Sequence, residues 1–109
     1  MNINVEIQEN EQFVKSKIGG EIDAYTAPQV REALSPFAVK SNIHLTIDLT
    51  DVSYMDSTGL GVFVGLFKSI RANDGQLVLT GLSERLKRLF DITGLADIMD
   101  INSEVEGGV

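Results

Sequence analysis

Hydrophobic and polar residues alternate strictly from Ile43 to Leu49, in the order Ile-His-Leu-Thr-Ile-Asp-Leu. Because strand side chains point alternately to two faces, this pattern predicts a strand with one apolar and one polar face. Four further segments carry weaker strand patterns and are mostly bounded by glycine, asparagine or aspartate. They are residues 4–8, 12–18, 76–80 and 98–101. The first two are expected to form a hairpin across residues 9–11.

Three segments between these strands carry apolar residues at helical spacing. The first follows Pro28, which suits the first turn of a helix, and Pro36 is expected to distort or end this helix early. The second begins near residues 56–58 and is the most apolar. The third is capped by Ser83 and ends around residues 93–94, where Gly94 follows the helix. The residues expected to face inward are Val30, Ala33, Leu34 and Phe37, then Leu60, Phe63, Val64, Phe67 and Ile70, then Leu86, Leu89 and Phe90.

The order β-β-α-β-α-β-α-β predicts one α/β domain over residues 1–102, with a mixed, mostly parallel sheet and right-handed crossovers. Central strands covered on both faces are apolar on both sides, whereas the strand over residues 43–49 is polar on one side. Helices are therefore expected mainly on one face of the sheet. Residues 103–109 have no hydrophobic pattern, and we expect them to form a flexible carboxyl-terminal tail.

Composition narrows the possible functions. The chain has 109 residues and 43% hydrophobic content, which suits one core, and its lack of cysteine excludes disulfides and thiol chemistry. A net charge of -7 disfavours binding to nucleic acid or anionic lipid. The first residues lack a signal-peptide pattern, and no apolar run approaches the roughly 20 residues of a membrane span. We therefore expect a soluble, cytoplasmic protein that binds neither nucleic acid nor membrane.

The candidate functional residues Asp56, Ser57 and Thr58 join the alternating strand to the most apolar helix. In α/β folds, ligands and partners meet the chain at the carboxyl ends of strands. All three residues are good N-caps, so capping without further function is the ordinary interpretation. One cap needs only one of them, which leaves a hydroxyl exposed. A phosphate there would be tolerated by free backbone N–H groups and the helix dipole, so it would change the surface and not the fold.

Three other features have both a structural and a functional interpretation. Gly59, Gly61 and Gly65 match no nucleotide-binding loop, and they indicate close approach of the helix backbone to a strand or a bound protein. Asp23 is expected at the same end of the sheet as Asp56, where two carboxylates could bind magnesium, assist proton transfer or cap turns. His44 lies on the polar face of a strand, so a Ser-His-Asp triad is not expected.

Three segments of the chain resemble the STAS-domain anti-sigma-factor antagonists, and the similarity extends over nearly the whole chain. They are residues 20–23, 51–61 and 89–95, with Met-Asp-Ser-Thr-Gly at residues 55–59 as the specific run. The two ends of the chain most resemble antagonists of the sigma-B general stress pathway of Bacillus-type bacteria. The resemblance implies a fold wound as a STAS-type βα superhelix.

The resemblance also implies a switch between binding partners. The unphosphorylated antagonist binds an anti-sigma factor that is also a serine kinase, which releases the sigma factor for stress-response transcription. Phosphorylation of Ser57 by that kinase ends the contact, and a PP2C-type phosphatase restores it. On this reading the chain is no enzyme and needs no cofactor, since ATP belongs to the kinase. The expected partner-binding residues are Asp23, Asp56, Ser57, Thr58, Gly59 and Gly61.

Two other functions remain open from the sequence. A phospho-aspartate receiver would use Asp48 or Asp51 as phosphoacceptor and Asp23 in a metal site, but the region 98–101 lacks the lysine such a site needs. A STAS module could instead sense a small molecule or belong to a larger signalling scaffold. A chain of that kind would be expected to contain further domains.

Overall fold

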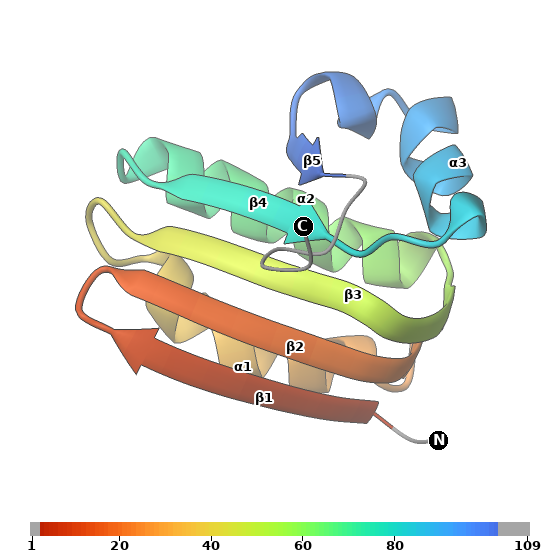
Figure 1. The fold of residues 1–109 in the computed structure, drawn as a ribbon, viewed down its shortest axis with the longest axis horizontal. Coiled ribbons are helices and arrows are strands. Elements are labelled where there is room, and N and C mark those ends of the chain that lie inside the picture. Colours follow the sequence, from red (N-terminus) through yellow and green to blue (C-terminus); the bar gives the residue numbers. More distant parts are fainter. Residues whose placement is uncertain (1–2, 103–109) are drawn as a thin grey trace.

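The computed structural model describes residues 3–102, which form a mixed five-stranded sheet and three α-helices (Figure 1). The elements are β1 (Ile3–Asn10), β2 (Phe13–Ile22), α1 (Ala27–Ala38), β3 (His44–Met55), α2 (Ser57–Ala72), β4 (Gln76–Thr80), α3 (Glu84–Ile92), the 3₁₀ helix η1 (Leu95–Asp97) and β5 (Asp100–Asn102). The strands lie in the order β1-β2-β3-β4-β5, with β1 antiparallel to β2 and all other neighbours parallel. This confirms the predicted element order and sheet type. The expected tail, 103–109, lies outside the described residues.

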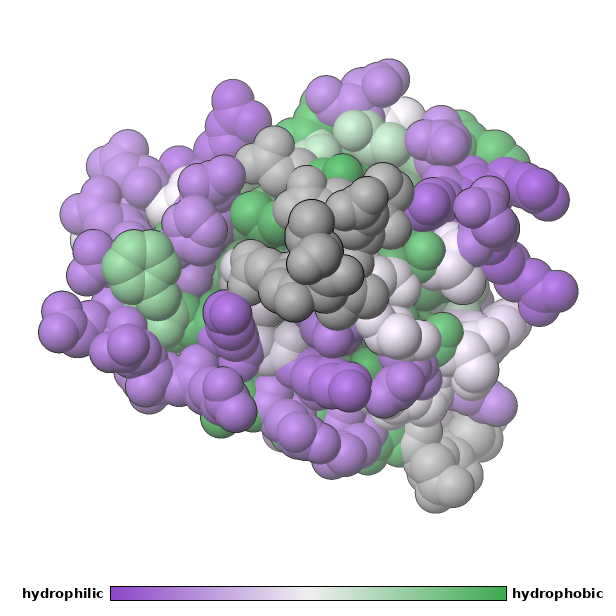
Figure 2. Space-filling view, viewed as in Figure 1, coloured by the Kyte–Doolittle hydropathy of each residue, from purple (hydrophilic) through white to green (hydrophobic). Residues whose placement is uncertain are grey.

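Helices α1 and α2 lie behind the same face of the sheet (Figure 1), as the one-sided alternation predicts. The opposite face carries mostly hydrophilic residues over β1 and β2 (Figure 2). Helix α3 packs beside α2, where the rings of Phe63 and Phe90 meet edge to face at 6.5 Å between centroids. Edge-to-face contact is the geometry that aromatic quadrupoles favour.

The core fills the space between the sheet and the two helices behind it. Alternate residues of the strands supply one side of this core, and the apolar stripes of the helices supply the other. Burying each large aliphatic or aromatic side chain contributes about 1.5–3 kcal/mol. The largest fully buried side chains are Phe63, Phe90, Ile18, Ile22, Leu34, Ile43, Leu45, Ile47, Leu49, Ile70, Leu79 and Val14.

Strand β3 is longer than the alternation predicts. It continues to Met55, so residues 51–55 belong to the strand and are not part of a loop. Val52 and Met55 are buried while Asp51 and Tyr54 are exposed, which breaks strict alternation. The break has a physical cause, because the register between β2 and β3 shifts twice along this stretch.

Three other boundaries differ from the prediction. The hairpin turn lies at residues 11–12, where Glu11 adopts a positive φ of 56°. A 3₁₀ helix occupies residues 95–97, so the last strand starts at Asp100 and not at Ile98. Helix α1 continues past Pro36 to Ala38, so of the predicted distortion or early end the early end does not occur. Ala38 is buried, and this packing holds the last turn although Pro36 removes one backbone donor.

The glycines of α2 occupy two different environments. A Cβ on Gly59 would lie 2.6 Å from the carbonyl oxygen of Ile22 and 2.7 Å from its Cγ2, so only glycine lets the helix approach β2 so closely. A Cβ on Gly61 or Gly65 would have no other atom within 4 Å. The predicted close approach is therefore confirmed within the chain at Gly59 alone.

Gly59 and Gly61 form a matched pair for testing this packing. We expect Gly59→Ala to lower the free energy of unfolding by roughly 1–3 kcal/mol, because the added methyl group would press on the backbone of β2. Gly61→Ala should raise it by up to about 1 kcal/mol, since alanine favours the helix and the space is open. Chemical denaturation of both variants would measure the difference. Equal effects of the two substitutions would contradict the packing described for α2.

Candidate functional site

The pairing of β2 with β3 brings two loops to one edge of the sheet. Ile22 and Met55, the last residues of these strands, are register partners, and the amide of Asp56 donates to the carbonyl of Ile22 at 3.2 Å. Asp23 and Asp56 directly follow this pair. Both loops lie at the right-hand end of the sheet in Figure 1, which confirms that the two aspartates share an edge.

Asp56 is the N-cap of α2. Its Oδ1 accepts a hydrogen bond from the amide of Gly59 at 3.0 Å, and its backbone is extended. Ser57 and Thr58 are the first two residues of the helix, and both are exposed. Neither hydroxyl forms a hydrogen bond within residues 3–102. One of the three candidate caps therefore caps the helix, and the two hydroxyls remain available.

The first turn of α2 offers free backbone amides to an anion, although the carboxylate of Asp56 caps the same turn. The amides of Ser57 and Thr58 donate to no acceptor among the residues that the structure describes, as is usual in a first turn. The first turn contains no acidic residue, and the helix is 16 residues long. The positive end of the helix dipole thus faces the Ser57 hydroxyl without a carboxylate inside the turn.

Asp23 holds the loop between β2 and α1. Its Oδ1 accepts hydrogen bonds from the amides of Tyr25 at 2.9 Å and Thr26 at 3.1 Å. The buried Thr26 hydroxyl donates to the carbonyl of Glu21 at 2.7 Å and accepts from the amide of Asp23 at 2.9 Å. Sequence reasoning missed Tyr25 and Thr26, although aspartate three residues before threonine is a recognisable turn signal.

The geometry favours capping over metal binding for Asp23 and Asp56. Each carboxylate already accepts hydrogen bonds from backbone amides of its own loop. Within residues 3–102 no group of three or more histidine, cysteine, aspartate or glutamate side chains is placed to hold a metal ion. The two aspartates therefore shape the edge by ordering its loops.

The aspartates that a phospho-aspartate receiver would use, Asp48 and Asp51, do not lie beside Asp23. Asp48 accepts from the amide and hydroxyl of Thr50, at 2.9 and 2.5 Å, and Asp51 pairs with Lys17 at 3.3 Å. Along the β2–β3 ladder, Asp48 is the partner of Lys17 and Asp51 that of Gly19. Both come before the strand end that Asp23 follows, so no acidic pocket joins the three.

His44 is remote from Ser57. It is the first residue of β3, at the opposite end of the strand, and its ring lies 5.5 Å from that of Phe13. A strand rises about 3.3 Å per residue, so the length of β3 separates His44 from the start of α2. The expectation that no Ser-His-Asp triad forms agrees with this placement.

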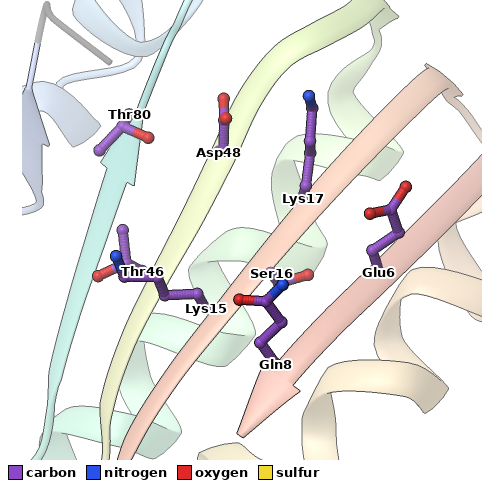
Figure 3. A pocket seen from close by; sticks show the side chains of 8 residues that line it. All are labelled: Glu6, Gln8, Lys15, Ser16, Lys17, Thr46, Asp48 and Thr80. Atoms are coloured by element: carbon purple, nitrogen blue, oxygen red, sulfur yellow. The ribbon is translucent and has the colours of Figure 1, made fainter. Parts of the chain in front are cut away.

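A hollow of about 200 Å³ lies on the open face of the sheet (Figure 3). Its lining residues come from β1 to β4 and are Glu6, Gln8, Lys15, Ser16, Lys17, Thr46, Asp48 and Thr80. Acidic and basic groups are interleaved there, and neighbouring Asp51 neutralises Lys17. The hollow therefore concentrates neither sign of charge, unlike the start of α2.

None of the helices in residues 3–102 is both long and apolar enough to span a bilayer.

The comparisons with known proteins agree with this geometry. The STAS domain model matches residues 4–108. The anti-sigma-B factor antagonist of Listeria monocytogenes is 61% identical over 108 residues, which cover 98% of this chain and 94% of that protein. A crystal structure of an anti-sigma factor antagonist from Mycobacterium paratuberculosis aligns with a TM-score of 0.85 at 22% identity, covering 96% of this chain and 89% of that one.

A second solved structure shares the fold. The Bacillus cell fate determinant SpoIIAA in its phosphorylated form aligns with a TM-score of 0.74 at 23% identity, covering 94% of this chain and 95% of that one. The STAS domain model, which matches residues 4–108, includes the whole of β2, β3 and α2, the elements that form the edge described above. The chain belongs to the STAS domain family, in the branch of the anti-sigma-B factor antagonists.

Proposed function

We propose that the chain is a phosphorylation-controlled antagonist of an anti-sigma factor. In its unphosphorylated form it binds an anti-sigma factor that is also a serine kinase, and the sigma factor is released for stress-response transcription. That kinase phosphorylates Ser57 and ends the contact, and a PP2C-type phosphatase reverses the modification. The observation that carries the proposal is the exposed Ser57 hydroxyl on the first residue of α2, beside a cap that Asp56 provides.

The relatives support two parts of this proposal separately, namely the class of partner and the modification by phosphate. The name of the Listeria protein, at 61% identity, gives the class of partner, an anti-sigma-B factor. The phosphorylated form of SpoIIAA shows that a protein of this fold accepts a phosphate. Both are regulatory binding proteins by name, and we assign the chain to that class and not to the enzymes. Because the proposed partners act on transcription, we propose that the switch operates in the cytoplasm.

The physical basis of the switch is the cost of burying charge. A phosphate adds about -1.5 to -2 charge units, and burying that charge unpaired in an interface costs several kcal/mol. A change of roughly 3–4 kcal/mol in binding free energy corresponds to about 10²–10³-fold in affinity. The free form tolerates the same charge, because the unpaired amides of Ser57 and Thr58 face it. Binding can therefore be lost without a change in fold.

We propose that some of the predicted site residues contact the partner and that the others hold the contacting residues in place. Thr58 is exposed next to Ser57, and Gly61 lies one turn further on the exposed side of α2. Gly61 and Gly65 also line a groove between α1 and α2, and within residues 3–102 the space next to each of these glycines is open. Asp23 and Asp56 order the two loops of the edge, and buried Gly59 seats α2 against β2. We propose Ser57, Thr58 and Gly61 as contacts, with the other three supporting them.

Substitution of Ser57 tests the switch. We expect Ser57→Ala to bind the anti-sigma factor and to be insensitive to the kinase, because its surface stays uncharged. Ser57→Asp should bind at least about tenfold more weakly, since it places a negative charge at the centre of the interface. Titration calorimetry would measure affinity, and circular dichroism should show equal helix content in both variants.

A control variant with the same added charge distinguishes the effect of where the charge lies from the effect of the net charge of the chain. Ser41 is exposed in the turn before β3, at the opposite edge of the sheet. Ser41→Asp adds the same charge there and should bind as tightly as the unmodified chain. Tight binding of Ser57→Asp, or equal weakening by Ser41→Asp, would contradict the proposed interface.

The phosphorylated residue can be identified directly. After incubation with the anti-sigma kinase and ATP, we expect one acid-stable phosphate on Ser57, because this hydroxyl is exposed and not needed as the cap. Thr58→Val should still be labelled, and Ser57→Ala should not. Mass spectrometry of peptides spanning residues 54–68 would locate the group. Labelling of Thr58, or an acid-labile phosphate on an aspartate, would refute the assignment.

A further inference from the structure

Tyr25 is an exposed aromatic residue that folding does not explain. Its side chain is 79% exposed, the largest value among the exposed large hydrophobic residues in the described part of the chain. Within residues 3–102 its ring forms no aromatic contact and its hydroxyl no hydrogen bond. Single exposed apolar residues are common on protein surfaces, so exposure alone assigns no role. Position and rigidity distinguish this one.

The position of Tyr25 is the edge that carries Ser57. Tyr25 lies in the β2–α1 loop, and Ser57 follows the β3 end that pairs with the end of β2. The first turn of α2 touches the last residue of β2, because a Cβ on Gly59 would meet Ile22. Tyr25 and Ser57 therefore lie in neighbouring segments at the same end of the sheet.

The loop that carries Tyr25 is ordered before any partner binds. The amide of Tyr25 donates to Asp23 at 2.9 Å, and the next residue, Thr26, is 4% exposed with its hydroxyl bonded to Glu21 at 2.7 Å. An aromatic ring on a fixed backbone loses little conformational entropy on binding. Tyrosine is also among the residues that most often contribute the main binding energy of interfaces.

The charges around Tyr25 indicate the chemistry of the partner. Glu21, Asp23 and Asp56 are exposed or half-buried at this edge, and none of them forms an ion pair within residues 3–102. A complementary surface would place basic groups opposite these carboxylates. An apolar recess between those basic groups would accept the ring of Tyr25.

We propose that Tyr25 is the anchor by which the chain binds its anti-sigma factor, inserting its ring into an apolar recess with a basic rim on that partner. This inference rests on the proposed function and adds a separate determinant to it. The hydroxyl of Ser57 controls whether the partner is bound, and the ring of Tyr25 contributes to how tightly it is bound. The ring contact is independent of the state of Ser57.

The test compares Tyr25→Ala with Phe13→Ala, using the purified anti-sigma-B factor from the chain's own organism. Phe13 is 55% exposed and starts β2 at the opposite edge, so it controls for the loss of an exposed aromatic ring. By titration calorimetry we expect Tyr25→Ala to weaken binding at least about tenfold. Tyr25→Phe and Phe13→Ala should stay within about threefold of the unmodified chain. Thermal unfolding should show that all three variants remain folded.

The outcomes separate this inference from the function on which it rests. If Ser57→Asp loses binding while Tyr25→Ala binds like the unmodified chain, Tyr25 is not the anchor and the proposed function stands. Equal weakening by Phe13→Ala would also overturn the assignment, because the effect would not depend on this edge. If the unmodified chain does not bind the anti-sigma-B factor, the proposed function and this inference both fail.

Discussion

The parallel pairing of β2 with β3 is the constraint on which the site depends. It joins Ile22 to Met55, and the amide of Asp56 and the bare backbone of Gly59 extend the contact into α2. The buried side chains of both strands hold this register, since a slip by one residue would move them to the wrong face. The two functional loops therefore keep their relative position for the same reason that the core stays packed.

At the start of α2, the helix cap and the proposed phosphorylation site are different residues. Asp56 satisfies the Gly59 amide, so the fold does not depend on the hydroxyl of Ser57. The amides of Ser57 and Thr58 remain unpaired within the described residues and can face an added anion. If Ser57 itself were the cap, modification would remove a helix contact worth about 1 kcal/mol. The arrangement lets the chemistry of the surface change while the fold stays the same.

How much the sequence predicts depends on how local each interaction is. The alternation of residues 43–49, the cap at Ser83 and the stop at Gly94 are local signals, and the structure confirms them. The extension of β3 to Met55 depends on register shifts against β2, which no single segment encodes. The continuation of α1 past Pro36 depends on tertiary burial of Ala38, which outweighs the local effect of proline. Capping chemistry and family resemblance were enough to propose the site residues from the sequence, whereas the proposal for Tyr25 needed the folded loop.

A switch of this kind works best when attraction and control come from different physical interactions. Hydrophobic contact by an exposed ring contributes equally with and without a phosphate, so it raises the affinity of both states. In the proposed switch, the electrostatic penalty of a phosphate on Ser57 would act on one state only, and it alone would set the ratio of the two affinities. If the ring contact were too strong, a penalty of roughly 3–4 kcal/mol would leave the modified form bound at cellular concentrations. In the proposed switch, the strength of the Tyr25 contact would therefore be limited by the charge that a single phosphate can bring, and the two determinants would have to be matched in size.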